Sequence, residues 1–351
     1  MKALLTLSLL FLSSLFIGQN EFNKYMNEAN FCMQKEDYIN AIKKYSKALE
    51  YKSSASNHYK VADVYMYRAI CRFSLQNTES ALSDLDEALK IKPEYTNLYQ
   101  LKSQIYFHNK QFDKCIEWCD KGLEIKPGAD DMLMRKAGAL TSLKRYNESN
   151  AIYFKLLEEN NRNQKACKMI ANNYQMKKNW DSAQVYFSMA IQIDPLDFES
   201  FFDRGICKAE KKDFAGALSD NEQAMRIDSL EKFIGYNNIA YFIKLAEKDY
   251  KGAIEYFNKA IELNPKFAYS YSNRGYSKLK LGDIKGAYQD IRKSIELDNT
   301  NSYAYKNLAL VCLEDGKKSD ACKYLLKAKA MGYEERYDDE VEKLLQEHCK
   351  N

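Results

Sequence analysis

Residues 250–261 read Tyr-Lys-Gly-Ala-Ile-Glu-Tyr-Phe-Asn-Lys-Ala-Ile, and this stretch decides the fold. Its apolar positions, which include Ala253, Phe257 and Ala260, lie three or four residues apart, with lysine and glutamate between them. This spacing places the apolar side chains on one face of an α-helix. The stretch is therefore predicted to be an amphipathic helix that packs partly through small residues.

The small position at Ala253 returns along the chain at intervals close to 34 residues. It is occupied by Ala41, Ala81, Cys115, Ser149, Ala183, Ala217, Ala253, Ala287 and Ala321. A second small position lies twelve residues earlier in eight of the nine units, and the exception is Tyr241, which follows Ala240. Small residues at two such positions indicate two helices that cross closely, because a large side chain would hold the backbones apart.

Each unit is predicted to contain a first helix, a tight turn and a second helix. Pairs such as Glu36-Asp37 and Lys212-Asp213 signal the turn. In six units an aromatic residue stands three positions before the small position of the Ala253 series, at Tyr38, Phe112, Tyr146, Trp180, Phe214 and Tyr250. Four second helices are followed by a proline, at Pro93, Pro127, Pro195 and Pro265, where the helix cannot continue.

This order of small, aromatic and proline positions resembles the tetratricopeptide repeat family. The resemblance covers residues 22 to 335 and implies an all-α solenoid of helical hairpins, a superhelix, with residues 336–351 as a carboxyl-terminal capping helix. The nine expected repeats span about 22–55, 62–95, 96–129, 130–163, 164–197, 198–231, 233–267, 268–301 and 302–335. A single repeat buries too little apolar surface to fold alone, so neighbouring repeats must stack.

The amino terminus has a different composition from the repeats. Lys2 precedes an apolar run over residues 3–17, and Gly18 follows it. A positive start, a short apolar run and a small residue are typical of a secretory signal peptide, here residues 1–18. We therefore expect an exported protein, periplasmic or secreted, with no membrane span in the mature chain. An uncleaved amino-terminal membrane anchor and a buried first helix are the alternatives.

The nine cysteines have two interpretations. Exported proteins commonly pair their cysteines, and nine cannot all pair within one chain. Most of them fall on apolar helical positions of the repeat, where a free thiol behaves as a small hydrophobe. They are interpreted mainly as core residues rather than as a disulfide framework.

Composition and motifs favour binding over catalysis. Lys and Arg number 53 against 49 Asp and Glu, without a concentrated basic stripe, so nucleic acid is not an expected partner. The nearest metal-like group, His108 with Cys115 and Cys119, lies on repeat packing positions. No catalytic or phosphate-binding motif is present. No cofactor, metal, catalytic residue or small-molecule substrate is expected.

The family resemblance implies that the first helix of each repeat lines an inner, concave groove. The candidate contacts for a protein or peptide partner are Met26, Met66, Gln100, Gln104, Lys168, Asn172, Phe202, Tyr241, Tyr269, Tyr276, Tyr303 and Lys306. The leading hypothesis is a non-catalytic interaction scaffold that binds its partner in this groove. The alternative is a structural component of an envelope assembly that packs through its convex surface, and the third is an enzyme or an enzyme's accessory subunit.

Overall fold

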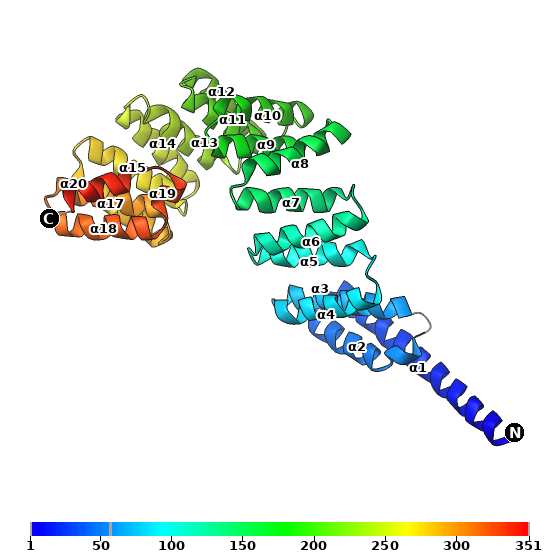
Figure 1. The fold of residues 1–351 in the computed structure, drawn as a ribbon. Helices are drawn as coiled ribbons and strands as arrows, with labels where there is room; N and C mark the ends of the chain where they lie inside the picture. Colours follow the sequence, from blue (N-terminus) through cyan, green and yellow to red (C-terminus); the bar gives the residue numbers. More distant parts are fainter. Residues whose placement is uncertain (1, 56–57, 350–351) are drawn as a thin grey trace. The chain divides into compact units, whose positions relative to one another are not determined.

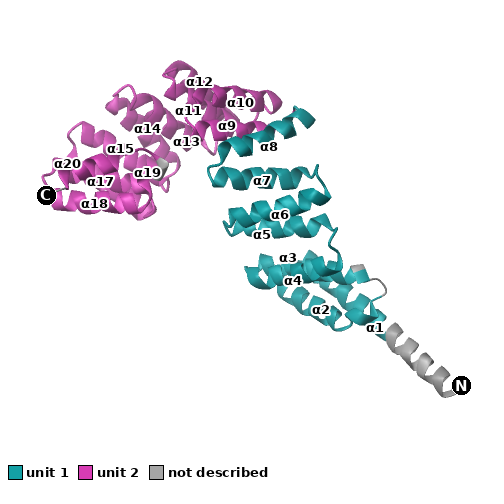
Figure 2. Ribbon diagram, viewed as in Figure 1, with its two compact units in different colours: residues 1–161 teal, residues 162–351 magenta. Residues whose placement is uncertain are grey.

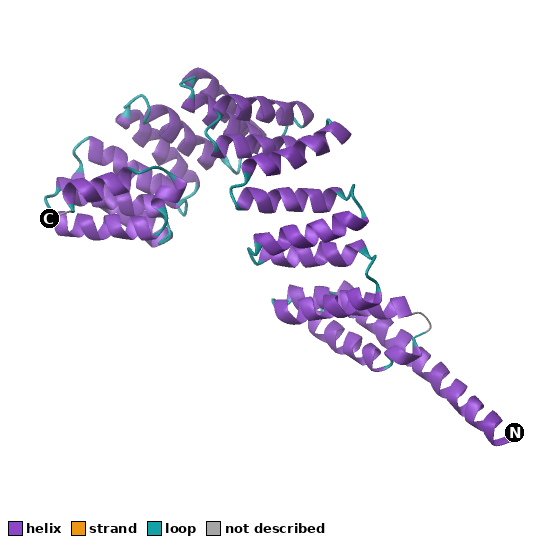
Figure 3. Cartoon of the chain, viewed as in Figure 1, coloured by secondary structure: helices purple, strands orange, loops and turns teal. Residues whose placement is uncertain are grey.

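The computed structural model describes residues 2–55 and 58–349, and all of their side chains except those of residues 2–16, 59, 335 and 336 (Figure 1). Helices joined by short turns make up this part of the chain, and it contains no strand (Figure 3). The chain divides into two compact units, residues 1–161 and 162–351 (Figure 2).

Unit 1 is a series of helices that pack mainly against their neighbours in sequence. In order they are α1 (Lys2–Gln34), α2 (Tyr38–Glu50), the short 3-10 helix η1 (Lys52–Ser54), α3 (His58–Ser74), α4 (Thr78–Ile91), α5 (Thr96–His108), α6 (Phe112–Ile125), α7 (Asp130–Ser142) and α8 (Tyr146–Glu159). Antiparallel pairs such as α3 with α4 and α5 with α6 are the predicted hairpins.

Unit 2 continues with the same pattern. Its helices are α9 (Gln164–Met176), α10 (Trp180–Ile193), α11 (Phe198–Glu210), α12 (Phe214–Ile227), α13 (Lys232–Asn238), η2 (Ile239–Lys244), α14 (Tyr250–Leu263), α15 (Ala268–Lys280), α16 (Ile284–Leu297), α17 (Ser302–Glu314), α18 (Lys318–Ala330), α19 (Tyr333–Arg336) and α20 (Glu340–His348). The predicted all-α solenoid of helical hairpins is confirmed within each unit.

The small positions lie where the two helices of a hairpin cross. Ala41, Ala81, Ala253 and Ala321 are completely buried, as a close crossing requires. Gly275 shows how little room remains. A Cβ added there would lie 2.6 Å from Cγ1 of Ile291 and 3.0 Å from the carbonyl oxygen of Ala287 on the facing helix. Larger side chains at these positions would force the helices apart.

The irregular repeat around Tyr241 is accommodated by a change of helix type. Ala240 and Ala253 are thirteen residues apart, whereas Gly275 and Ala287 in the next hairpin are twelve apart. The extra residue falls in η2, which is a π-helix and therefore takes up one additional residue in its turn. Ala240 is completely buried and occupies the small position, so Tyr241 is displaced to its side.

The turns inside the hairpins adopt a repeated backbone conformation. In every hairpin, the residue just before the N-cap of the second helix has a positive φ. Examples are Glu36 at 58°, Lys212 at 65° and Gly316 at 73°. Asp213, next in the chain, accepts a hydrogen bond from the backbone N–H of Gly216 at 2.9 Å and caps α12. This left-handed residue followed by an Asp or Asn cap explains the turn pairs found in the sequence.

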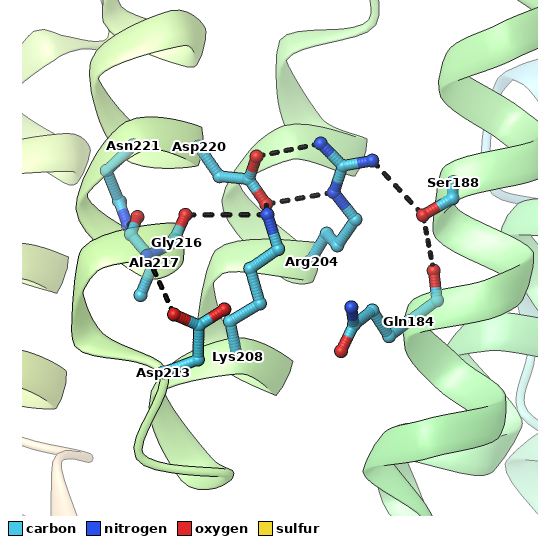
Figure 4. A network of polar contacts seen from close by, with 9 residues as sticks. All are labelled: Gln184, Ser188, Arg204, Lys208, Asp213, Gly216, Ala217, Asp220 and Asn221. Atoms are coloured by element: carbon cyan, nitrogen blue, oxygen red, sulfur yellow. Dashed lines mark hydrogen bonds and ion pairs between the residues drawn. The ribbon is translucent and has the colours of Figure 1, made fainter.

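A buried polar network joins helices of successive hairpins, and the sequence analysis did not foresee it. Arg204 donates to both carboxylate oxygens of Asp220, at 2.9 and 2.7 Å, and to Ser188 Oγ of the preceding hairpin at 3.1 Å (Figure 4). Lys208 Nζ lies 2.9 Å from the same carboxylate. The arrangement recurs with Arg68 and Asp84 in unit 1 and with Arg274 and Asp290 in unit 2.

The carboxyl-terminal segment packs on α18 as two short helices rather than one. α19 precedes α20, and α20 buries Val341 and Leu345 in a cluster with Leu325 of α18. A disulfide between Cys322 and Cys349 ties the end of α20 to α18. The interpretation of the cysteines as core residues is therefore wrong for this pair.

The other seven cysteines are free thiols. Cys71, Cys115, Cys119, Cys167, Cys207 and Cys312 are buried, and Cys32 is half-buried. The core interpretation holds for these six buried residues. Sequence spacing could not reveal the bridge, because its two cysteines are distant in sequence and one lies beyond the last repeat.

The predicted signal peptide overlaps α1, which runs without a break through the expected cleavage position. Gly18 is buried, and a Cβ there would lie 2.4 Å from Oγ of Ser54. Gly18 therefore packs closely against Ser54, besides its predicted role as the small residue that ends the signal peptide. Among the described residues, no helix is both long and apolar enough to cross a membrane.

Candidate partner-binding pocket

A concave pocket of about 910 Å³ lies in unit 2 and is walled mainly by aromatic side chains. The lining residues are Lys178, Trp180, Ala209, Glu210, Lys212, Phe214, Tyr241, Phe242, Leu245, Ala246, Tyr250, Tyr276, Tyr303, Lys306, Tyr333, Tyr337, Asp338 and Glu340. First helices of the hairpins, hairpin turns and the carboxyl-terminal segment all contribute. We call this the aromatic pocket. Its volume lies in the range of pockets that enclose a compact ligand or several side chains of a peptide.

Rings in the pocket form a continuous chain of contacts. The ring centroids of Phe242 and Tyr241 are 4.9 Å apart, and those of Tyr241 and Tyr303 are 6.2 Å apart. Tyr303 continues to Tyr337 at 5.3 Å, and Tyr337 to Tyr333 at 5.0 Å. Because each ring is held by its neighbours, the wall presents rigid surface that a partner can cover at little cost in side-chain entropy.

The tyrosine hydroxyl groups of the wall remain protonated. Burial raises the pKa of Tyr303 well above its ordinary value, and burial also raises the pKa of Tyr241 and of Tyr276. A neutral phenol can donate one hydrogen bond and accept others. The pocket therefore offers hydrogen-bonding groups at its surface as well as apolar area.

Lys306 is a buried cation beneath this wall. Its ammonium group lies 3.1 Å from a carboxylate oxygen of Glu340 and 4.4 Å from the ring centroid of Tyr303. The Tyr276 ring is 5.4 Å away. Burial lowers the pKa of Lys306, and the Glu340 carboxylate opposes that shift. Lys306 thus binds the carboxyl-terminal segment to the groove.

Four of the predicted contacts meet at the aromatic pocket: Tyr241, Tyr276, Tyr303 and Lys306. Tyr303 and Lys306 are engaged by the carboxyl-terminal segment, so the surfaces open to a partner are mainly those of Tyr241 and Tyr276. Tyr269 does not join them. It is 38% exposed and contacts the ring of Phe267 instead.

The remaining predicted contacts lie outside the pocket. Lys168 on α9 pairs with Asp197 at 3.0 Å and Glu199 at 2.7 Å, and Asn172 is half-buried on the same helix. Phe202 is buried in the core of unit 2, so its prediction as a groove contact is wrong. Its side chain packs with Ala217 and Met225 because it faces the crossing helix.

The predicted contacts of unit 1 are likewise divided between core and surface. Met66 is buried in the unit's core, which corrects the expectation that it faces a partner, and Met26 packs partly against that core. Gln100 donates to Asp131 Oδ2 at 3.0 Å, whereas Gln104 is exposed. None of these four lines the aromatic pocket.

Several lining residues were not predicted from the sequence. Trp180, Phe214 and Tyr250 were assigned only to the repeat's packing pattern, and their shared position three before the small residue could have marked a common surface. Tyr333 and Tyr337 belong to the carboxyl-terminal segment, whose return to the groove depends on long-range packing. Phe242 was missed because the π-helix changes the register of the lining positions.

The cysteine and histidine side chains, which could bind a metal or act as nucleophiles, lie apart from the pocket in the described part of the chain. No group of three or more His, Cys, Asp or Glu side chains there is placed to hold a metal ion. Cys115 and Cys119 are buried in the core of unit 1. The pKa of Cys115 is raised, mainly by its hydrogen bond with Cys119 and to a smaller extent by burial.

Comparisons with known proteins identify the repeat. The family models described as "Tetratricopeptide repeat" match residues 96–128 and 268–301, and the one described as "TPR repeat" matches residues 243–282. The helix pairs outside these ranges have the same arrangement, but the count of nine repeats and their boundaries stay predictions.

Relatives and a solved structure agree with this match. A TPR repeat-containing protein of Methanocaldococcus jannaschii is 25% identical over 74% of this chain and 47% of its own length. The Hsp70-Hsp90 organizing protein of Triticum aestivum is 27% identical over 30% of this chain and 17% of its own. The chain thus spans about half or less of the length of these relatives. A tetratricopeptide repeat protein of Parabacteroides merdae has a similar fold, with a TM-score of 0.56 and 15% identity over 82% of this chain and 99% of its own.

Proposed function

We propose that this chain, which carries tetratricopeptide repeats, is an exported interaction scaffold that binds a peptide segment of a partner protein in the aromatic pocket. Proteins built of such repeats are in general non-catalytic scaffolds for other proteins. The observation that carries the proposal is the chain of rings from Phe242 through Tyr241 to Tyr303, held in a concave surface beside charged groups. Rigid aromatic anchors with polar groups around them are typical of binding hot spots.

A peptide fits the pocket better than a small metabolite does. The lining comes from several hairpins and from the carboxyl-terminal segment, so the contact surface is extended along the groove. Apolar rings alternate with lysines, carboxylates and phenol groups, which match the side chains and main chain of an extended peptide.

The test compares two tyrosine variants of the full-length chain in affinity capture from its native cells. Tyr276 lines the pocket, whereas Tyr288 lies on α16, is 44% exposed and lies outside it. Tyr276→Ala should weaken partner capture by about 2 kcal/mol, or roughly thirtyfold, while Tyr288→Ala should not. Equal capture by both variants, with unchanged melting temperatures, would move the function away from the pocket. Loss with Tyr288→Ala alone would favour an outer surface and the structural-component hypothesis.

Export is part of the proposal. Its support is the amino-terminal pattern of Lys2, the apolar run and Gly18, together with the Cys322–Cys349 disulfide, since disulfides persist mainly in oxidising compartments. Amino-terminal sequencing of the native protein should begin at Gln19. Met1 on membrane-bound material would support the uncleaved anchor instead, and Met1 on cytoplasmic material would end the export argument.

A further inference from the structure

The part of the aromatic pocket that the repeats contribute is basic as well as aromatic. Lys178, Lys212 and Lys306 are its cations, and Glu210 is its single acid among the described lining residues. The other two lining acids, Asp338 and Glu340, belong to the carboxyl-terminal segment that follows the last hairpin. The repeats alone therefore form a surface with an excess of positive charge around aromatic rings.

The chain itself shows what chemistry this surface accepts. Residues 333–340 contribute two tyrosines and two acids to the lining of the pocket. The ring of Tyr337 packs on Tyr303, and Glu340 pairs with Lys306. The hydroxyl group of Tyr333 donates to the same Glu340 carboxylate at 3.2 Å. An aromatic and acidic segment thus packs on one aromatic ring of the groove and forms an ion pair with one of its lysines.

Other lining residues, contributed by the hairpins, have the same aromatic and basic character. Tyr241, Phe242 and Tyr276 provide the rings. Lys178 and Lys212 are exposed, and neither has an ion pair within the part of the chain that the structure describes. Both sit at left-handed turn positions, with φ of 57° and 65°, so their backbones are held in place.

We propose that the partner supplies a peptide segment of the same aromatic and acidic chemistry as residues 333–340. Its aromatic side chains pack on Tyr241, Phe242 and Tyr276, and its carboxylates face Lys178 and Lys212. Glu210 at the same rim disfavours a uniformly anionic polymer, so both the rings and the charges are needed. This inference rests on the proposed function and narrows the class of partner.

The probe is a labelled, end-blocked peptide with the sequence of residues 333–340, Tyr-Glu-Glu-Arg-Tyr-Asp-Asp-Glu, titrated with the full-length chain by fluorescence anisotropy. One control peptide replaces its acids by the corresponding amides, and another replaces its tyrosines by alanine. Both control peptides should bind about tenfold more weakly or worse, because each lacks one of the two contacts.

The chain offers a matched pair of charge reversals. Lys178→Glu with Lys212→Glu changes the pocket rim, whereas Lys110→Glu with Lys144→Glu makes the same change at equivalent exposed turns of unit 1. Glu36 already occupies this turn position with φ of 58°, so the backbone tolerates glutamate there. The rim pair should weaken probe binding by about tenfold or more, and the unit 1 pair should leave it within about twofold.

Three results would overturn the inference: no binding of the acidic probe, equal binding of the amide peptide, or equal loss from the two pairs of reversals. If the probe fails while partner capture still depends on Tyr276, the inference is wrong and the proposed function stands. If partner capture is also independent of Tyr276, the proposed function fails as well.

Discussion

Gly275→Ala tests the helix crossing on which the fold depends. In most exposed helix interiors this substitution stabilises a protein, because alanine has the higher helix propensity, by about 1 kcal/mol. At Gly275 the new methyl group would lie 2.6 Å from Ile291 Cγ1 and 3.0 Å from the Ala287 carbonyl oxygen. The second of these atoms belongs to the backbone of α16 and cannot move without moving the helix.

The expected sign follows from the two opposing effects. Overpacking of a close contact costs about 1–3 kcal/mol, and contact with backbone belongs at the upper end of that range. After subtraction of the propensity gain, Gly275→Ala should lower the free energy of unfolding by about 1–2 kcal/mol. Urea denaturation followed by circular dichroism measures the change as a lower midpoint.

Gly138→Ala is the matched control. A Cβ at Gly138 on α7 would lie 3.5 Å from the Phe107 ring, an ordinary contact, so this variant should gain about 0.5–1 kcal/mol. Gly275→Ala combined with Ile291→Leu should recover part of the loss, because the second change removes the contact with Ile291 Cγ1 and leaves the contact with the Ala287 carbonyl oxygen. Ala309 with Leu325 is the corresponding native pair in the last hairpin. A gain from Gly275→Ala similar to that from Gly138→Ala would refute the crossing geometry.

Three further predictions concern the network, a half-buried acid and the disulfide. Asp220→Ala should lower the free energy of unfolding by about 2–4 kcal/mol, because Arg204 and Lys208 lose their shared carboxylate, and an unchanged urea midpoint would contradict this role. Burial raises the pKa of Asp203 from 3.8 to about 7, so the folded state loses stability as the pH rises through that interval. Above pH 7, Asp203→Asn should therefore have a free energy of unfolding about 1–2 kcal/mol higher than that of the wild type. This is less than the full pKa shift implies, because the side chain is only partly buried. Below about pH 4 the two free energies of unfolding should converge. Cys322→Ser with Cys349→Ser should speed hydrogen exchange across α20 without affecting α11, and exchange that matches the oxidised wild type would show that the disulfide does not hold α20.

The repeat could be predicted from the sequence because its signal is local and redundant. Small residues such as Ala253 and Ala287 recur at fixed intervals, and each hairpin packs mainly against its neighbours. The turn pairs and prolines repeat the same information. Agreement among several independent positions identifies a solenoid even where one position is irregular, as at Tyr241.

The pocket could be predicted only in part. The place of a residue on the first helix does not decide whether its side chain faces the groove or packs in the core. Tyr276 and Tyr241 were found by position on the first helices, but Phe202 and Met66 at comparable positions turn into the core. The contribution of Tyr337 and Glu340 depends on the path of the chain after the last hairpin, and no repeat pattern specifies that path.

The most direct test of the central claim is site-specific photo-crosslinking in the native cells. A photoreactive phenylalanine derivative placed at Tyr276 would lie in the aromatic pocket, and one at Tyr288 would lie on α16 outside it. We expect a crosslinked partner protein from position 276 and none from position 288. A crosslink from position 288 alone, with a folded chain at both positions, would contradict binding in the aromatic pocket.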